Sequence, residues 1–451
     1  MSSDTLKYFY SISRTRLILI FMMFVYSVSV AIGHKYYLSV EQSFWGFNEP
    51  DFNAGALFSI AILTFLPSMV LPTNLSRPSA IFLYSLMFFV YVPAVVIGML
   101  NFEDSVSRYL GILGSFCLGV VFCCILSRLV STDKEDCKEP SRFLIFMNFI
   151  GSLSCIFLLF LTYKDILSFS GLDDIYLQRE KGAATSLFIG YCQVYLAYVF
   201  SPILFVYGYL YRRIMSFALA SFGFLFVFMI TAERTVLLLP FVLLGISFVF
   251  KRRGLAISNI YYLFFGGAFF IVLISMFFEY SSFVSELGVY FFTRTVAIPG
   301  LFVSQYYDLF SVQGYTHWSH VSVIGKLLDV PAAYMNDEKW PALGKILAER
   351  VLGIQSQSNA NFVATDGVAA WGGLGVFIIC SIYGFWLLIL DWVSKGWDKI
   401  FILPALFPLA FVSTNGSLFT LLTSFGGFYW ILVLLLDKYK LTMKVPRVNE
   451  R

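Results

Sequence analysis

The feature that most limits how this chain can fold is a succession of long, nearly uncharged apolar runs. Runs of about 20 apolar residues, the length a helix needs to cross a hydrocarbon core of roughly 30 Å, recur along most of the sequence. Of the 451 residues, 59% are hydrophobic and only 13% are charged. A soluble protein with that composition has too few polar side chains to cover its surface. We therefore expect an all-α polytopic membrane protein, because a membrane β-barrel would have alternating strands instead of unbroken runs.

Hydropathy predicts about twelve membrane-spanning helices in one integral membrane domain that covers residues 1–451. Lys and Arg indicate the orientation, because they are enriched in the cytoplasmic loops of membrane proteins. With both termini cytoplasmic, most of the 31 Lys and Arg residues fall on the inner side, including the short turns "YRR" and "KRR". The expected spans lie at 15–35, 54–72, 79–100, 108–129, 142–163, 186–211, 214–232, 235–250, 259–279, 367–391, 398–414 and 416–436.

One outer connection is far longer than the others. Residues 280–366 are expected to form a large outer loop, and long loops in compact proteins are usually functional. The beginning of this loop is apolar and aromatic but is interrupted by Arg294 and Pro299. That pattern favours helices lying at the membrane interface over a spanning segment. We therefore expect the functional residues on the outer face.

Three arginines are expected on this outer face. Arg234, in "TAERTVLLLP", begins an apolar run, and a cation at a helix N-terminus opposes the helix dipole and needs a nearby anion. Glu233 is the simple partner, and a lipid-linked phosphate is the functional one. Arg179 in "YLQREKG" and Arg294 in "FTRTVAIPG" complete the set. Guanidinium groups bind phosphate oxygens in a bidentate fork, so the three could converge on a diphosphate; contact with lipid headgroups or surface ion pairs are the alternatives.

Two further outer residues are candidates for proton transfer. His320 ends the motif "THWSH" in the large loop, and an imidazole can accept a proton near neutral pH. Asp366 precedes the expected helix at 367–391, where a carboxylate either caps the helix or binds an acceptor. Two histidines without a third ligand are weak evidence for zinc, so we expect no metal and no cofactor.

The stretch "SNANFVATDGVAAWGGLGVF" leads from the loop into that helix. Glycine has no side chain, so glycines in a membrane helix let a neighbouring helix or a lipid approach closely. We expect this role for four of them, namely Gly367, Gly372, Gly373 and Gly375.

Several of these stretches, taken in order, resemble the Wzy-type O-antigen polymerases, which polymerise oligosaccharide repeat units in bacterial envelopes. The stretch "AERTVLLLP" resembles the start of the family's mid-chain helix. The close matches cover about a quarter of the chain. The other matching elements are Arg294, Pro299-Gly300, the aromatic pair Tyr306-Tyr307, Ser319-His320, and an Asn-rich element with Asn359, Asn361 and Asp366 before a Gly-rich helix.

The resemblance implies a helical, GT-C-like membrane glycosyltransferase that works without a metal. It would lie in the bacterial inner membrane with both termini cytoplasmic, its large loop and active site facing the periplasm. Donor and acceptor would both be oligosaccharides linked to undecaprenyl diphosphate. Membrane lipids and a chain-length regulator would be its other partners, and no nucleic acid is expected.

The resemblance also implies roles for the residues. Arg179, Arg234 and Arg294 would bind the diphosphate, with Arg294 also catalytic, and either His320 or Asp366 would be the acceptor base. A second set would contact the glycan, although core packing is an equal alternative for its three aromatic members. This set comprises Asn359, Asn361, Tyr306, Tyr307 and Trp318.

Two other functions would fit a protein of this architecture. An O-antigen ligase has a similar architecture and differs in its acceptor. A lipid-linked oligosaccharide flippase would also have about twelve helices, but we would expect two similar halves and charged residues within the spans. The sequence contains no visible internal repeat, which favours an enzyme of the outer leaflet.

Overall fold

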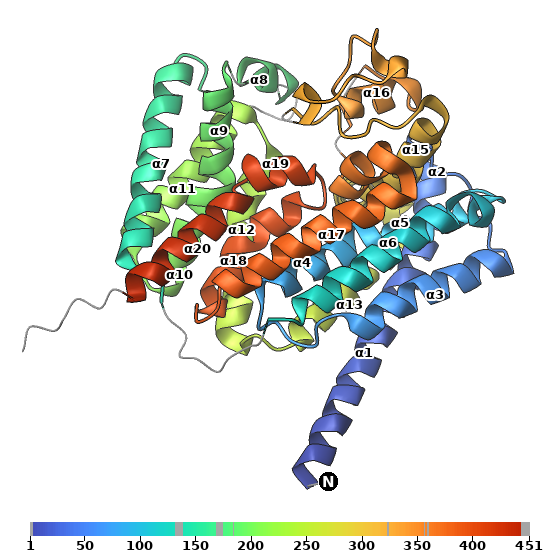
Figure 1. Ribbon diagram of the computed structural model, residues 1–451, viewed down its shortest axis with the longest axis horizontal. Helices are drawn as coiled ribbons and strands as arrows, with labels where there is room; N and C mark the ends of the chain where they lie inside the picture. Colours follow the sequence, from blue (N-terminus) through green and yellow to red (C-terminus); the bar gives the residue numbers. More distant parts are fainter. Residues whose placement is uncertain are drawn as a thin grey trace, which may run out of the picture.

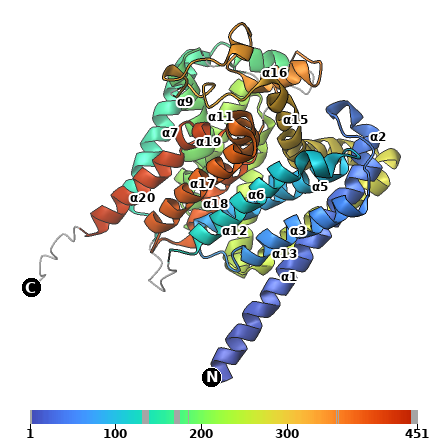
Figure 2. The same ribbon diagram turned by 45° about the vertical axis from the view of Figure 1, so that its right-hand side comes forward.

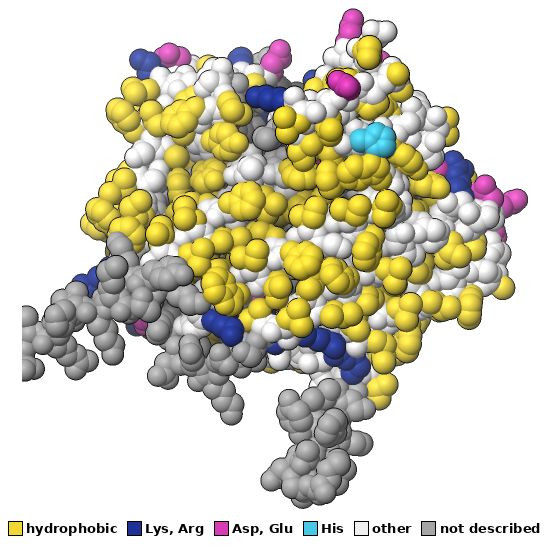
Figure 3. Space-filling view, viewed as in Figure 1, with side chains coloured by type: hydrophobic (Ala, Val, Ile, Leu, Met, Phe, Trp, Pro, Cys, Tyr) yellow, Lys and Arg dark blue, Asp and Glu magenta, His cyan; other side chains and the backbone are white. Residues whose placement is uncertain are grey.

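The computed structural model describes residues 3–130, 139–167, 175–183, 185–322, 324–355, 357–358 and 360–442. The regular elements in these ranges are helices (Figure 1), and eleven helical stretches among them are long and apolar enough to cross a membrane. Two shorter apolar helices, α3 (Ala54–Val70) and α18 (Lys399–Val412), complete the bundle. Figure 3 shows hydrophobic side chains over most of the middle of one face, as expected for a surface in contact with lipid. The chain is a multi-pass helical membrane protein.

The long stretches follow one another along most of the chain, and several combine two or three of the labelled helices. In order, they are α1–α2 (Arg14–Glu41), α4–α5 (Pro78–Leu100), α6 (Ser105–Ser127), α7 (Arg142–Tyr163), α9–α10 (Leu187–Leu210), α11 (Ile214–Thr231), α12 (Arg234–Arg253), α13 (Ser258–Phe277, with its extension to Tyr280), α14–α15 (Ser282–Gln313), a π-helical turn with α17 (Val363–Val393), and α19–α20 (Leu418–Asp437).

Each expected span has a helical counterpart in the structure. The spans expected at 54–72 and 398–414 are the two shorter helices α3 and α18. Proline lies inside both, at Pro67 in α3 and at Pro404 and Pro408 in α18; each proline lacks a backbone N–H and bends the helix. The long stretch Ser282–Gln313 has no counterpart among the expected spans.

The two ends of the bundle differ in chemistry. At one end, which we call the basic face, Arg16 donates to the carbonyl of Leu71 at 2.5 Å and Arg128 to that of Val70 at 2.7 Å. The opposite end, the loop face, carries residues 314–358 and α16 (Leu343–Arg350). Figures 1 and 2 show α16 at one end of the molecule and the start of α1 at the other.

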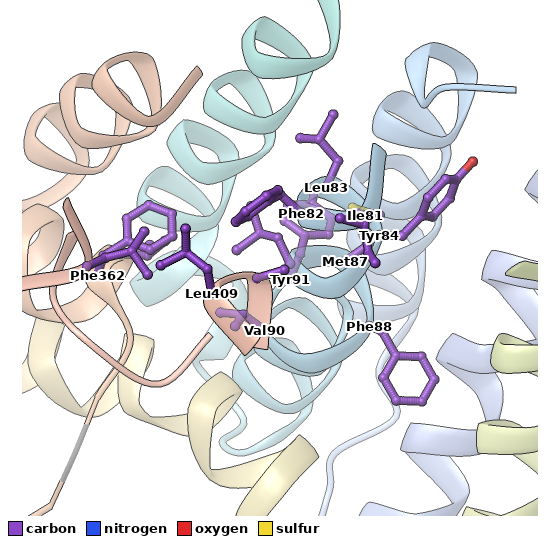
Figure 4. Close-up of a cluster of buried hydrophobic side chains, with 14 of the residues drawn as sticks. Ile81, Phe82, Leu83, Tyr84, Met87, Phe88, Val90, Tyr91, Phe362 and Leu409 are labelled. Carbon is purple, nitrogen blue, oxygen red and sulfur yellow. The ribbon is translucent and has the colours of Figure 1, made fainter. Parts of the chain in front are cut away.

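The centre of the bundle is the stretch α4–α5, whose side chains are almost all buried. In Figure 4, Phe362 and Leu409 lie in the same cluster as the side chains of α4, although they come from distant parts of the chain. Tyr383 in α17 packs against both Phe362, with ring centroids 4.8 Å apart, and Phe82, at 6.4 Å. Phe362, near the end of the expected outer loop 280–366, therefore reaches the middle of the core.

The stretch Ser282–Gln313 starts and ends at the loop face. Near its start, Tyr37 at the loop-face end of the first span donates to the carbonyl of Ser285 at 3.5 Å. Near its end, Asp308 pairs with Arg108, at the loop-face end of α6, at 2.8 Å. Between these points a π-helical segment (Gly288–Ala297) leads to Pro299, whose carbonyl accepts from buried Asn361. The segment thus enters the bundle from the loop face and returns to the same face. The sequence had predicted helices at the membrane interface for this region.

The Gly-rich stretch forms a helical hairpin. The chain leaves helical geometry at Trp371 and Gly372, which has φ +58°, and glycine adopts such a φ without strain. A Cβ at Gly375 would lie 2.1 Å from the carbonyl oxygen of Gly367, whereas eight residues of a continuous helix would separate them by roughly 12 Å. Residues 363–371 therefore run antiparallel to the rest of α17.

This hairpin shows that the expected span at 367–391 is not one continuous helix. Residues 367–371 belong to the first arm of the hairpin, and the span begins only after the turn at Gly372. The expectation that glycines allow close approach holds for Gly367 and Gly375, which bring the two arms of the hairpin together. Gly372 has a different role, since it forms the turn itself.

Candidate functional site

A cavity of about 1240 Å³ contains all three arginines that the sequence singled out. Arg179 comes from α8 (Ile175–Lys181), Arg234 is the first residue of α12, and Arg294 lies in the π-helical segment before α15. The remaining walls come from α9 and the turn after it, α11, α14, and the region from the end of α18 to α20. Their polar members include Gln193, Tyr198, Thr231, Glu233, Thr235, Glu286, Thr295, Thr414 and Asn415.

The cavity is lined in part by large, exposed apolar side chains. Leu238 of α12 and Tyr290 of the π-helical segment both line it, and they are 59% and 44% exposed. Large apolar side chains on the outer surface of a membrane protein face lipid. The cavity therefore combines cationic side chains with an edge that a lipid chain can contact.

A tight turn directs two charged side chains into this cavity. Helix α11 ends at Thr231, Ala232 has a left-handed backbone with φ +49°, and α12 begins at Arg234. A positive φ is uncommon for residues other than glycine, and such strained positions cluster at functional sites. Because the turn is so short, Glu233 and Arg234 both face the cavity.

Uncharged groups are among the partners of two of the arginines in the cavity. The guanidinium of Arg234 lies over the ring of Tyr290, 4.9 Å from its centroid, and Arg179 donates to the carbonyl of Ala232 at 3.5 Å. Arg294 is exposed to the cavity. Within the described ranges, neither Arg234 nor Arg294 forms an ion pair. Glu233 is thus not the ion-pair partner of Arg234 that the sequence suggested as the simple explanation.

Glu233 has a distinct environment. Its side chain is exposed to the cavity, but the surrounding protein partly desolvates the carboxyl and raises its pKa. Two smaller effects oppose the rise: Tyr198 donates a hydrogen bond to Oε2 at 3.3 Å, and the charge of Arg179 favours the carboxylate. From the sequence, Glu233 was expected only as a counter-ion. Its position in a turn of two residues between apolar runs was the signal that it shares the site with Arg234.

The structure brings His320 and Asp366 together, but outside the cavity. His320 Nε2 lies 3.8 Å from Asp366 Oδ1, and the side chains are 8% and 0% exposed. His320 Nδ1 is 2.9 Å from the hydroxyl of Thr316. Neither residue lines the cavity. The predicted site is therefore divided into an accessible cavity that holds the three arginines and a buried His320–Asp366 pair.

Asp366 caps a helix, although not the one expected. It lies inside the first arm of the hairpin, so it is not the N-cap of that arm. Instead its Oδ2 accepts from the backbone N–H of Leu418 at 2.5 Å and from the hydroxyl of Ser417 at 2.9 Å. These are the first residue and the N-cap of α19 (Leu418–Thr423). The carboxylate thus joins the hairpin to the start of α19.

The four predicted glycan contacts that the structure describes also lie outside the cavity. Asn361 is fully buried and donates to the carbonyl of Pro299 at 2.7 Å. Tyr306 is fully buried, which favours core packing for this residue and leaves no ring face for a sugar. Tyr307 packs at 6.2 Å against Tyr109. Trp318 donates to the carbonyl of Asp366 at 2.6 Å. Asn359 lies outside the described residues.

The chemistry of the cavity suits an anion. In the described part of the chain, no three His, Cys, Asp or Glu side chains come close enough to hold a metal ion, and the cavity has three arginines against two carboxylates. Guanidinium groups are permanently charged donors that match phosphate oxygens. No family model, curated protein or solved structure matches the chain. Function is therefore inferred from the residues themselves.

Proposed function

We propose that this protein is a glycosyltransferase that polymerises oligosaccharide repeat units linked to undecaprenyl diphosphate. The observation that carries the proposal is that Arg179, Arg234 and Arg294, from three separate segments, line one cavity with a lipid-accessible edge. A diphosphate with a long isoprenoid chain needs both features, namely fixed cations for its charge and an apolar surface for its tail.

The proposed reaction places the diphosphate of the donor among the arginines. As the bond between the sugar and the diphosphate breaks, negative charge grows on the leaving oxygen. Arginines already in position stabilise that charge more in the transition state than in the ground state, which is what accelerates a reaction. Confinement of both lipid tails to the membrane brings donor and acceptor together.

The proposed function also implies a cellular location and an orientation in the membrane. The protein would be a GT-C-like enzyme of the bacterial inner membrane, with the loop face toward the periplasm and both termini in the cytoplasm. The concentration of Arg16, Arg77 and Arg128 at the basic face supports this orientation, since basic residues are enriched on the cytoplasmic side. A chain-length regulator would be its protein partner.

Deletion of the gene in a strain that makes a surface polysaccharide tests the proposal, with glycan analysis as the measurement. A polymerase deletion leaves single repeat units on the cell surface, and wild-type protein restores the long-chain ladder. Loss of all surface polymer with long lipid-linked chains retained would identify a ligase instead. Repeat units trapped on the cytoplasmic side would identify a flippase, and either result would overturn the proposal.

A further inference from the structure

Glu233 has no structural role that accounts for a carboxylate in this position. It occupies the N-cap position of α12, but its side chain makes no capping hydrogen bond. It forms no ion pair with Arg234 in the described part of the chain. Partial desolvation of a charged carboxylate costs free energy unless something offsets it. A partly desolvated carboxylate that faces a cavity and makes neither a capping hydrogen bond nor an ion pair is a candidate for chemistry.

The surroundings of Glu233 are those of a proton acceptor beside an anion site. Tyr198, from the turn after α9, holds one carboxylate oxygen, and the other, Oε1, has no hydrogen bond among the described residues. The charged groups that face it across the cavity are Arg179 of α8, Arg234 of α12, Glu286 of α14 and Arg294 of the π-helical segment. The segments from α18 to α20 contribute uncharged polar groups, Thr414 and Asn415.

We propose that Glu233 is the base that accepts the proton of the acceptor hydroxyl, an inference that rests on the proposed function. In the step, the acceptor oxygen forms a bond to the anomeric carbon of the donor sugar while its O–H bond breaks and the proton passes to Glu233. The bond between the anomeric carbon and the diphosphate oxygen breaks at the same time. Its electron pair leaves with undecaprenyl diphosphate, whose charge the arginines stabilise. The proton later passes to water, which restores the carboxylate.

The geometry favours Glu233 over both bases expected from the sequence. His320 and Asp366 are buried outside the cavity, and both oxygens of Asp366 already have partners within the protein. A base must come within hydrogen-bond reach of the proton it removes. Glu233 lines the same cavity as the arginines. Burial also raises the pKa of its carboxyl, which strengthens it as a base near neutral pH.

The test compares Glu233→Gln with Glu41→Gln, which changes an exposed carboxylate at the end of α2 on the same face. Purified proteins are assayed for transfer with lipid-linked repeat units, and for binding of undecaprenyl diphosphate. We expect Glu233→Gln to lose at least about 100-fold in transfer rate, the lower bound for removal of a general base, while its binding of undecaprenyl diphosphate is retained. Glu41→Gln should match the wild type in both measurements.

The pH dependence of the wild-type protein gives a second measurement that does not depend on the variant folding. The transfer rate should fall on the acidic side with one ionisation, at a pH above the ordinary glutamate value of about 4.3. A wild-type rate without this acidic limb, or normal transfer by Glu233→Gln, would overturn the role of Glu233 and leave the proposed function standing. A wild-type protein that transfers no lipid-linked glycan would overturn the proposed function itself.

Discussion

Two polar clusters lie near the loop face, namely the cavity and the buried His320–Asp366 pair. They differ in whether their charged side chains have partners within the protein. In the cavity, Arg234 and Arg294 face open space without an ion-pair partner among the described residues. In the buried pair, Asp366 accepts hydrogen bonds from Thr365, Ser417 and the N–H of Leu418. The first cluster has unused capacity to bind a ligand. In the second, both oxygens of Asp366 already accept hydrogen bonds within the protein, although His320 Nε2 has no hydrogen-bond partner among the described residues.

This difference distinguishes residues that can bind a ligand from residues that stabilise the fold. Buried polar groups are nearly always hydrogen-bonded, because leaving one unpaired is costly. A saturated buried carboxylate therefore contributes to stability, while accessible charges without partners suit a charged ligand. The two clusters are also connected: Thr414 and Asn415 line the cavity, and Ser417, a few residues later, binds Asp366. The buried pair thus helps to position one wall of the cavity.

The largest effect is expected for Arg234→Ala. Removal of one preorganised charge-stabilising donor typically lowers the rate by about 10²–10³-fold, so the long-chain glycan of a complemented deletion strain should be almost lost. Arg253→Ala is the matched control. Arg253 ends the same helix at the basic face, and its guanidinium lies 4.8 Å from the centroid of Tyr262, much as Arg234 lies over Tyr290.

Arg253→Ala should give a normal glycan ladder at equal expression. Arg234→Lys refines the comparison, because it keeps the charge and loses the fork that binds two oxygens; an intermediate ladder is expected. If Arg234→Ala and Arg253→Ala behave alike, position in the cavity is irrelevant and the distinction between the clusters fails.

Hydropathy predicted a helix at each of the expected spans, but it did not predict the long helical stretch Ser282–Gln313 or the path of every apolar segment. The run 363–393 is apolar apart from Asp366, Asp391 and a few hydroxyl side chains, so a measure of composition and length does not detect its reversal at Trp371 and Gly372. The same limit applies to 282–313, where the dip at Pro299 depends on contacts with residues such as Asn361. Such contacts join positions far apart in the chain.

The part of the candidate site that could be predicted is the set of residues that the sequence assigned to the outer face of the membrane. Charge bias placed the three arginines on one face, and the structure brings them into one cavity. The burial of His320 and Asp366 was not predictable, because their partners, such as Leu418, lie far along the chain. Glu233 was overlooked because adjacency to Arg234 suggested an ion pair that the turn does not form.

A smaller effect, on stability, is expected for Asp366→Asn. The amide oxygen can still accept from the N–H of Leu418 and the hydroxyl of Ser417, but the N–H₂ group then replaces Oδ1, which now accepts from Thr365. The acceptor also loses its charge. A hydrogen bond to a charged group contributes about 1.5–3 kcal/mol and one to a neutral group about 0.5–1.5 kcal/mol, so thermal unfolding in detergent should show a lower Tm. Transfer activity per folded molecule should be largely retained.

Asp391→Asn is the matched comparison for this change. Asp391 is also buried, and it accepts from the backbone N–H and the hydroxyl of Ser79, at 2.8 Å and 2.6 Å, near the basic face. The two variants should behave alike, with lower stability and retained activity. If Asp366→Asn alone abolishes transfer in a folded protein, Asp366 has a role in chemistry and the buried pair belongs to the site.

The smallest expected effect is the change in Tm caused by Glu233→Gln. This substitution should raise the Tm, whereas Asp366→Asn should lower it. Because the pKa of Glu233 is raised in the folded protein, its charged form is less stable there than in the unfolded chain. The wild type therefore gains stability from this group as the pH falls through the folded pKa, and the penalty is complete above it. Glu233→Gln should have a higher Tm than the wild type at neutral and higher pH, and the difference should vanish below the unfolded pKa of about 4.3. A lower Tm at neutral pH would show that Glu233 supports the fold, as Asp366 does, whereas a higher one fits a residue retained for chemistry at the expense of stability.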